Sequence, residues 1–230
     1  MSKISTLYPI QLPSVADVVY DVLRKQILHG HLVPNQQLNL NKLESELAVS
    51  RTPLKMALAR LQNEGLVEIH PRRGTYVTQF REVDIRECFE LRIALEAQAL
   101  RHTFAPHNSA LRQEIMALFI TMDGYFASEA DWLEQLIDYM DMDRAAHVKI
   151  VQLSGNARMQ QAYEHANVQG YIAIMGTRFT YADVQKTQAE HREILSALQS
   201  GQLEPLLAAA RAHLENAGQR AVLRLTGEHS

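Results

Sequence analysis

The sequence predicts a mainly α-helical protein of two parts, an N-terminal unit of three helices plus a β-hairpin joined to a C-terminal all-helical bundle. Two observations indicate this division. Five of the seven prolines lie before residue 82, so the following 149 residues contain few helix breakers. Residues 1–81 hold ten Lys and Arg against six Asp and Glu, whereas the rest hold thirteen against twenty. We therefore predict a basic domain over residues 1–80 and an acidic helical domain over residues 81–230.

The composition is that of an ordinary globular chain. Hydrophobic residues make up 47% and charged residues 21%, which excludes disorder over most of the length. No apolar run approaches the ~18 residues that a membrane-spanning helix needs. The N-terminal residues lack the apolar core of a secretion signal, and the single Cys88 cannot form an internal disulfide. We expect a soluble cytoplasmic protein with no membrane partner.

The basic part begins with two helices. Residues 15–28 carry apolar side chains at three- and four-residue spacing, and Gly30 ends this first helix. Asn35 lies in the turn that follows, where a positive φ is tolerated. A second, short helix is expected to open near Asn41, because Glu44 three residues later completes a capping-box pattern.

A third helix and a hairpin follow. Ser50 is the expected N-cap of the helix, and a proline occupies its first turn. The leucines of this helix face inward, and three polar side chains point elsewhere: Arg51, Thr52 and Lys55. Two β-rich runs around the turn at Gly74 predict the hairpin. Three helices followed by a hairpin describe a winged helix-turn-helix.

Positive side chains gather at the start of the third helix and at the hairpin tip, where this fold contacts DNA. The Arg51 guanidinium can pair with guanine O6 and N7, whereas Lys55 is a point charge that suits a phosphate. A merely solvated surface is the alternative interpretation. We favour operator DNA as the partner, contacted by Asn41, Ser50, Arg51, Thr52, Lys55, Arg72, Arg73 and Gly74.

The acidic part is predicted to form six helices. Breaks near Pro106, Gly155 and Gly201 are among those that separate them. The expected spans are about 84–105, 108–128, 131–154, 156–177, 180–200 and 203–225. Helices of this number and length form a bundle with a substantial core.

Four side chains of metal-ligand type lie within otherwise apolar helix faces. Asp143 and His147 are four residues apart and therefore share one face, while His191 and His213 align with apolar residues of two later helices. A buried charge or imidazole without a partner costs several kcal/mol, roughly. A divalent metal would satisfy the whole set. Separate hydrogen bonds within the core are the alternative, and the spacing alone leaves both open.

Four short motifs in the basic part resemble the GntR family of bacterial transcription regulators. They occupy residues 30–34 (GHLVP), 49–55 (VSRTPLK), 64–67 (EGLV) and 72–74 (RRG), in that order. The family usually has glycine where this chain has Asn35 and Ala48. The resemblance implies a DNA-binding transcription regulator, such as a repressor, that is not an enzyme.

The acidic part resembles the effector-sensing FCD domain of the FadR subfamily, and six helices are similar to its VanR-like branch. The FCD pattern is an aspartate, a histidine four residues on and two later histidines, and it matches Asp143, His147, His191 and His213. The resemblance implies that these residues hold a divalent ion, zinc or else nickel or a similar metal. It also implies a small carboxylate effector at the metal and a homodimer on a pseudo-palindromic operator.

Arg92 is the first candidate for binding that carboxylate, because it lies on an apolar helix face. A salt bridge to Glu96, one turn along, is the alternative. Asn167, in the fourth predicted helix of the acidic part, is the second candidate. Two other functions use the same Asp/His cluster: a metal-dependent hydrolase, for which we find no general base beside the ligands, and a regulator that senses the metal itself.

Overall fold

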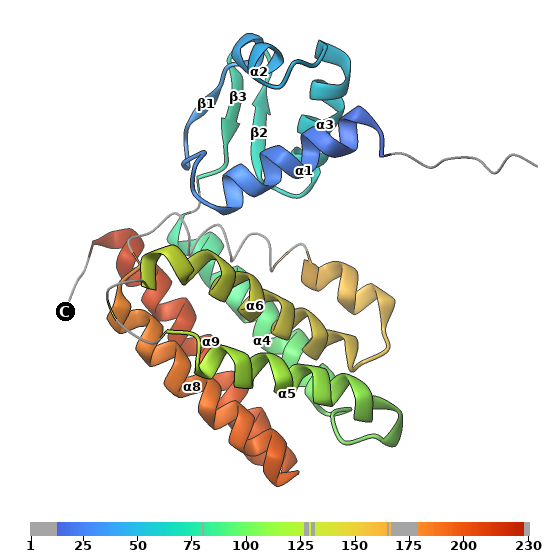
Figure 1. The fold of residues 1–230 in the computed structure, drawn as a ribbon, viewed down its shortest axis with the longest axis vertical. Coiled ribbons are helices and arrows are strands. Elements are labelled where there is room, and N and C mark those ends of the chain that lie inside the picture. Colours follow the sequence, from blue (N-terminus) through green and yellow to red (C-terminus); the bar gives the residue numbers. More distant parts are fainter. Residues whose placement is uncertain are drawn as a thin grey trace, which may run out of the picture.

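The computed structural model describes residues 13–79, 81–126, 129, 132–164, 166 and 179–227. An N-terminal unit with a small sheet lies at one end of the long axis and a helical unit at the other, as Figure 1 shows. The predicted fold class is confirmed, because a winged helix-turn-helix precedes an all-helical part.

The N-terminal unit is built around helix α1 (Val15–Leu28), which packs on helix α3 (Arg51–Asn63). Ser14 caps α1, since its hydroxyl accepts a hydrogen bond from the Asp17 backbone N–H. The inward leucines of α3 are buried as predicted: Leu54, Leu58 and Leu61. Because these leucines face the core, the opposite side of α3 faces solvent.

The second helix opens near Asn41 as predicted, but the residue expected to cap it was wrong. Helix α2 (Leu40–Glu46) has Asn39 as its N-cap, and the Asn39 side chain accepts a hydrogen bond from the Lys42 backbone N–H at 3.1 Å. Asn41 therefore lies inside the first turn, and its carboxamide oxygen is not a cap. Two asparagines two residues apart compete for this role, and the sequence pattern selected the wrong one.

The wing is a three-stranded antiparallel sheet. Strands β2 (Val67–His70) and β3 (Gly74–Val77) form the predicted hairpin, and β1 (Gln37–Leu38) pairs with the other edge of β3. A two-residue strand has too little periodicity to be found from sequence. Gly74 has a φ of 121°, and a Cβ there would lie 2.7 Å from the Gln37 amide nitrogen, so the wing requires glycine at this position.

Two departures from the family's usual glycines coincide with left-handed backbone. Asn35 has a φ of 63° and Ala48 a φ of 51°. Asparagine tolerates this conformation, whereas the Cβ of alanine makes it unfavourable by about 1 kcal/mol. The turn between α2 and α3 is therefore strained at Ala48.

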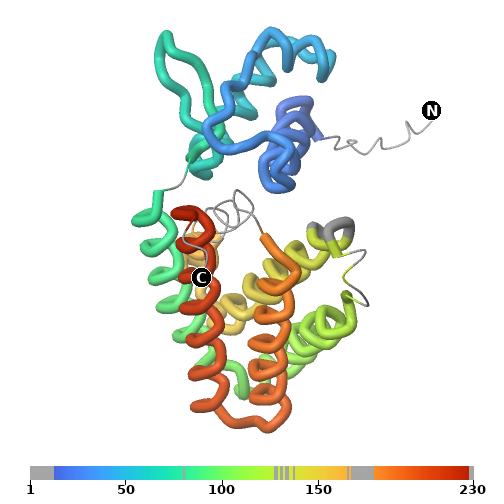
Figure 2. The backbone as a smooth tube through the Cα atoms, turned by 90° about the vertical axis from the view of Figure 1, so that its left-hand side faces the viewer, coloured from blue at the N-terminus to red at the C-terminus, as the bar shows by residue number. Residues whose placement is uncertain are grey.

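The helical unit follows the predicted order of helices. Figure 2 shows α4, α9 and α8 side by side. Residues 157–164 are also helical, and the other spans are α4 (Glu82–Leu100), η1 (Pro106–Asn108), α5 (Ser109–Asp123), α6 (Trp132–Gln152), α8 (Tyr181–Ser200) and α9 (Leu203–Thr226). Helices α4 and α9 approach closely, since a Cβ on Gly218 would lie 2.9 Å from the Phe89 ring. None of the described helices is both long and apolar enough to cross a membrane.

Candidate functional site

Three helices of the bundle bring the four predicted metal ligands together. Asp143 and His147 come from α6, His191 from α8 and His213 from α9, and their ligand atoms all lie within 4.8 Å of one another. The three histidines are no more than 3% exposed, and the Asp143 side chain is 18% exposed. Among the described residues the cluster is therefore enclosed by the bundle, and the aspartate is its most exposed member.

Two of the imidazoles are held by carboxylates through their Nδ1 atoms. His147 Nδ1 lies 2.6 Å from Glu96 Oε2, and His213 Nδ1 lies 3.0 Å from Glu190 Oε2. An ionised carboxylate can only accept a hydrogen bond, so each Nδ1 carries a proton, and in a neutral imidazole Nε2 then keeps its lone pair. The third imidazole, that of His191, has its Nδ1 3.3 Å from the Tyr139 hydroxyl.

The charges of these groups support this assignment. Burial acts to raise the pKa of Glu190, but hydrogen bonds from Arg220 and His213 outweigh it and lower that pKa to about 2. Burial lowers the pKa of His213 to about 4, although Glu190 opposes this shift. At neutral pH the glutamate is therefore ionised and the imidazole is neutral, which is the form that binds metals.

The atoms at the centre of the cluster fit a cation. His147 Nε2 and His213 Nε2 lie 3.2 Å apart, and in the neutral imidazoles both are acceptors. Asp143 Oδ1 and His191 Nε2 lie 3.1 Å apart, within ion-pair distance but, among the described residues, without the geometry of a hydrogen bond. Buried acceptors directed at one point are costly unless a positive charge lies between them. Three nitrogens and one oxygen match the donor set of zinc or nickel.

Arg92 makes the predicted salt bridge and also lines a cavity. Its Nε and Nη2 each donate to Glu96 Oε1 at 3.3 Å, and the Arg92 side chain is almost fully buried. The same guanidinium lines a cavity beside Asp143 and His213. The two interpretations of Arg92 are thus compatible. The other effector candidate, Asn167, lies outside the described residues.

The cavity has polar walls that the sequence analysis missed. Thr187, Arg220 and Arg224 line it together with Arg92, and its volume is about 30 Å³, enough for a few water molecules. Helical spacing could have indicated Arg220 as a member of the site, because it lies seven residues after His213 and therefore on the same face of α9. The two glutamates that hold the histidines were also missed as members of the site.

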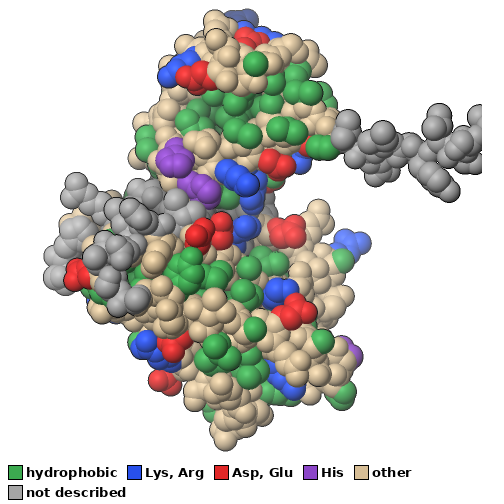
Figure 3. Space-filling view, in the orientation of Figure 1, with side chains coloured by type: hydrophobic (Ala, Val, Ile, Leu, Met, Phe, Trp, Pro, Cys, Tyr) green, Lys and Arg blue, Asp and Glu red, His purple; other side chains and the backbone are tan. Residues whose placement is uncertain are grey.

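The predicted DNA-contacting residues are exposed on α3 and at the wing tip. Thr52 and Lys55 are exposed on the first turns of α3, and Arg72 and Arg73 at the wing tip. Ser50 is the N-cap residue of α3, although its side chain makes no capping hydrogen bond within the described part of the chain. Figure 3 shows acidic and basic side chains interspersed over the visible face of the molecule. The DNA-binding assignment therefore depends on the positive residues that α3 and the wing tip expose.

Arg51 is already paired within the protein. Its Nη1 donates to Asn41 Oδ1 at 2.6 Å and lies 3.1 Å from Glu44 Oε2. Asn41 was predicted to contact DNA directly, and here it holds the arginine that is expected to read a base. Glu44 was considered only as part of a helix cap.

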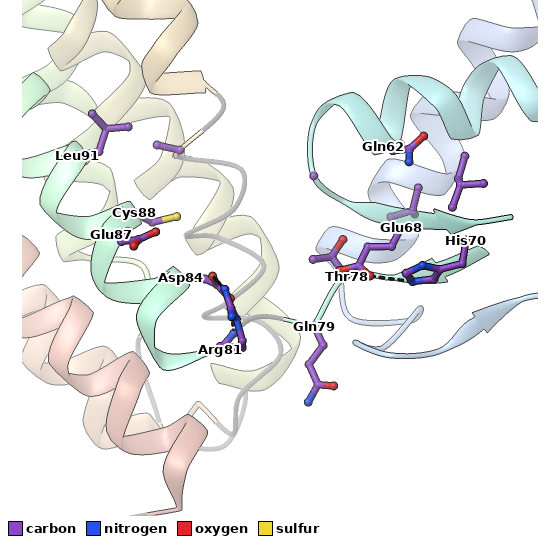
Figure 4. Close-up of a pocket in the computed structure, with 14 residues that line it drawn as sticks. Gln62, Glu68, His70, Thr78, Gln79, Arg81, Asp84, Glu87, Cys88 and Leu91 are labelled. Carbon is purple, nitrogen blue, oxygen red and sulfur yellow. Dashed lines mark hydrogen bonds and ion pairs between the residues drawn. The ribbon is translucent and has the colours of Figure 1, made fainter. Parts of the chain in front are cut away.

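A larger pocket of about 810 Å³ lies between the two units, and Figure 4 shows residues of both facing it. Glu68 and His70 line it from the wing, and Arg81, Asp84 and Cys88 from the start of α4. Burial raises the pKa of Cys88 to about 11, so this thiol stays protonated at neutral pH. None of the predicted ligands lines this pocket, and we assign the candidate site to the Asp/His cluster.

Comparison with known families identifies the class of protein. Residues 15–77 match the profile of the bacterial regulatory proteins of the gntR family, and residues 87–216 match the FCD domain. The chain therefore belongs to the GntR family of DNA-binding transcription regulators and carries an FCD domain. The expectation that it is a regulator and not an enzyme is confirmed by the same family assignment.

Curated relatives agree with this class. An uncharacterized HTH-type transcriptional regulator of Streptomyces ambofaciens is 27% identical over 198 residues, which cover 85% of this chain and 80% of the relative. The HTH-type transcriptional repressor GlaR of Escherichia coli K12 is 24% identical over 174 residues, 75% of this chain and 78% of the repressor. Three further relatives are matched over 64%, 60% and 57% of their own length.

Solved structures share the fold. A GntR transcriptional regulator from Rhodococcus sp. RHA1 superposes with a TM-score of 0.76 at 20% identity, covering 90% of this chain and 97% of that one. Escherichia coli McbR/YncC superposes with a TM-score of 0.67 at 20% identity, covering 95% and 100%. Both alignments include the N-terminal and the helical parts.

Proposed function

We propose that this protein is a metabolite-responsive transcription regulator whose helical domain holds a divalent metal ion. The ligands would be Asp143, His147, His191 and His213. The observation that carries this proposal is the convergence of their ligand atoms within 4.8 Å, with buried lone pairs facing one another. A bound zinc or nickel ion would supply an electrophilic centre to which an oxygen of a small molecule can bind.

The charges around the cavity favour a small monocarboxylate as the effector. The three arginines that line it pair with three acidic groups: Arg92 with Glu96, Arg220 with Glu190 and Arg224 with Asp183. Asp143 adds one negative charge, so a divalent ion would leave a net charge of +1 over the described residues of the site, which one carboxylate neutralises. The cavity of about 30 Å³ admits only a very small group, and a larger effector would have to move its walls.

The winged helix would bind DNA, and effector binding in the helical domain would change that binding. We propose a homodimer on a pseudo-palindromic operator, in which Arg51 reads a guanine and Lys55, Arg72 and Arg73 contact phosphates. Effector binding would change the relative placement of the two winged helices in the dimer and hence the half-site spacing. The exposure of these side chains on α3 and the wing supports this part of the proposal.

Metal analysis of the purified protein tests the centre. We expect about one zinc or nickel ion per chain, lost in Asp143→Ala and retained in His102→Ala, which changes an exposed histidine outside the cluster. A wild-type protein that binds neither ion when it is supplied would contradict the proposal.

Fluorescence anisotropy with an operator fragment tests the response. Small monocarboxylates should shift DNA affinity more than dicarboxylates of equal size, and only in the metal-loaded protein. A regulator that senses the metal itself makes a different prediction, since its DNA affinity would follow free zinc at a fixed effector concentration.

A further inference from the structure

We infer that Glu96 and Glu190 are positioning residues of the metal centre, each fixing one histidine ligand through its Nδ1 atom. The inference rests on the proposed metal centre and goes beyond it, because neither glutamate is among the four ligands. Each glutamate also binds an arginine of the adjoining cavity, so the two carboxylates connect the metal ligands to the effector site.

Glu96 is held from three directions in the bundle core. It lies on α4 and is fully buried, and its Oε2 accepts the hydrogen bond from His147 Nδ1 at 2.6 Å. Its Oε1 accepts from the Tyr163 hydroxyl at 2.7 Å and from Arg92 at 3.3 Å. A buried carboxylate with this many partners has a defined orientation.

Glu190 has the same arrangement on the other side of the cluster. Its Oε2 accepts from His213 Nδ1 at 3.0 Å and from Arg220 Nη2 at 2.8 Å. Its Oε1 accepts from Arg220 Nη1 at 2.6 Å and from Asn216 at 3.0 Å. Arg220 thus clamps both oxygens, a geometry that fixes the plane of the carboxylate as well as its position.

The consequence for the two histidines is a fixed tautomer and a fixed ring orientation. An ionised acceptor at Nδ1 keeps the proton there, and Nε2 then presents its lone pair to the centre of the cluster. A carboxylate partner also makes the imidazole a stronger ligand. His191 has only the Tyr139 hydroxyl at its Nδ1, so the two glutamates act on two of the three histidines.

Cobalt(II) titration followed by visible absorption tests the inference on the full-length protein. Glu96→Gln and Glu190→Gln keep the side-chain shape and remove the charge, and each should weaken Co²⁺ binding about 10- to 100-fold. Each should also shift the d–d bands at saturating cobalt, which a change in overall stability would not do. Glu90→Gln on α4 and Glu193→Gln on α8 change exposed glutamates and serve as matched controls.

The outcomes separate the two proposals. If wild type binds no Co²⁺, or if Asp143→Ala binds it equally well, the metal centre itself is refuted. If wild type binds through Asp143 but the two glutamine variants match it in affinity and in spectrum, the positioning role is refuted.

A measurement on the wild type covers the case in which a glutamine variant does not fold. Nitrogen-15 correlation spectra of the zinc-loaded protein should show two histidine Nδ1 protons shifted downfield and protected from exchange with water. Rapidly exchanging Nδ1 protons on both His147 and His213 would overturn the inference, since carboxylate-bound protons in a buried site exchange slowly.

Discussion

The Nε2 atoms of His147 and His213 lie 3.2 Å apart inside the helical bundle, with the two rings stacked at 12°. In the neutral imidazoles both nitrogens are acceptors, because each Nδ1 donates to a glutamate. Holding two acceptors this close would lower the stability of the bundle, and the proposed cation between them would offset that cost.

Metal binding should stabilise the protein in a way that depends on Asp143. At a free zinc concentration 100-fold above the dissociation constant, linkage gives about 2.7 kcal/mol. For a chain of this size that corresponds to a rise in Tm of roughly 5–10 °C. Differential scanning fluorimetry with and without zinc should show this rise in the wild type and in the His102→Ala control, and not in Asp143→Ala. An equal rise in Asp143→Ala would mean that zinc binds elsewhere.

Asp183 should contribute stability only above acidic pH. Burial would raise its pKa, but hydrogen bonds from Thr180 and the charge of Arg224 outweigh burial, so the folded-state pKa lies below the unfolded value of 3.8. The contribution is therefore fully present above about pH 4 and is lost as the pH falls through the folded-state pKa. Asp183→Asn should lower the free energy of unfolding by about 1 kcal/mol at pH 7. Urea titrations at pH 7 and pH 3 should show the difference between variant and wild type shrinking at the lower pH.

Ala48→Gly should stabilise the N-terminal unit. Alanine at a φ of 51° is unfavourable by about 1 kcal/mol, and glycine relieves this at some cost in chain entropy. We expect a net gain of up to about 0.5 kcal/mol in urea unfolding. Ala59→Gly, at an exposed position within α3, should have the opposite sign and cost about 1 kcal/mol. Destabilisation by both variants would show that the turn at Ala48 is not strained.

Arg51 and Lys55 should affect DNA binding differently. Arg51→Ala should cost about 1–3 kcal/mol on the operator and relax specificity at one base pair. Lys55→Ala should weaken binding to operator and scrambled DNA alike. It should also reduce the slope of the logarithm of the binding constant against the logarithm of the salt concentration by about one. Anisotropy titrations at several salt concentrations distinguish the two patterns. Lys25→Ala, on the exposed side of α1, is the control and should leave both quantities unchanged.

The sequence predicted the helices and singled out four Asp and His side chains because both follow from local spacing, whereas their convergence on one metal was implied by the FCD resemblance. Asp143 and His147 are polar residues four apart on an apolar helix face, and His191 and His213 each lie on the apolar face of another helix. The α-helical repeat therefore identifies all four. The GntR and FCD resemblances are confirmed by the family matches.

What the sequence did not predict involves pairing between helices. Glu96 and Glu190 belong to the site only because α4 packs on α6 and α8 packs on α9. Spacing along one helix does not reveal which neighbour it will face. Likewise, the hydrogen bond from Arg51 to Asn41 joins α3 to α2. The choice between Asn39 and Asn41 as the cap requires knowing the residue at which α2 begins, which the sequence does not fix.

The hydrogen bonds of Arg51 to Asn41 and Glu44 imply a threshold for recognition. In the proposed complex, a base that offers two good acceptors would draw the guanidinium away from Asn41 and Glu44, whereas a base that offers one or none would leave it where it is. Asn41 and Glu44 on α2 would then compete with mismatched DNA sequences for Arg51 and so raise its selectivity.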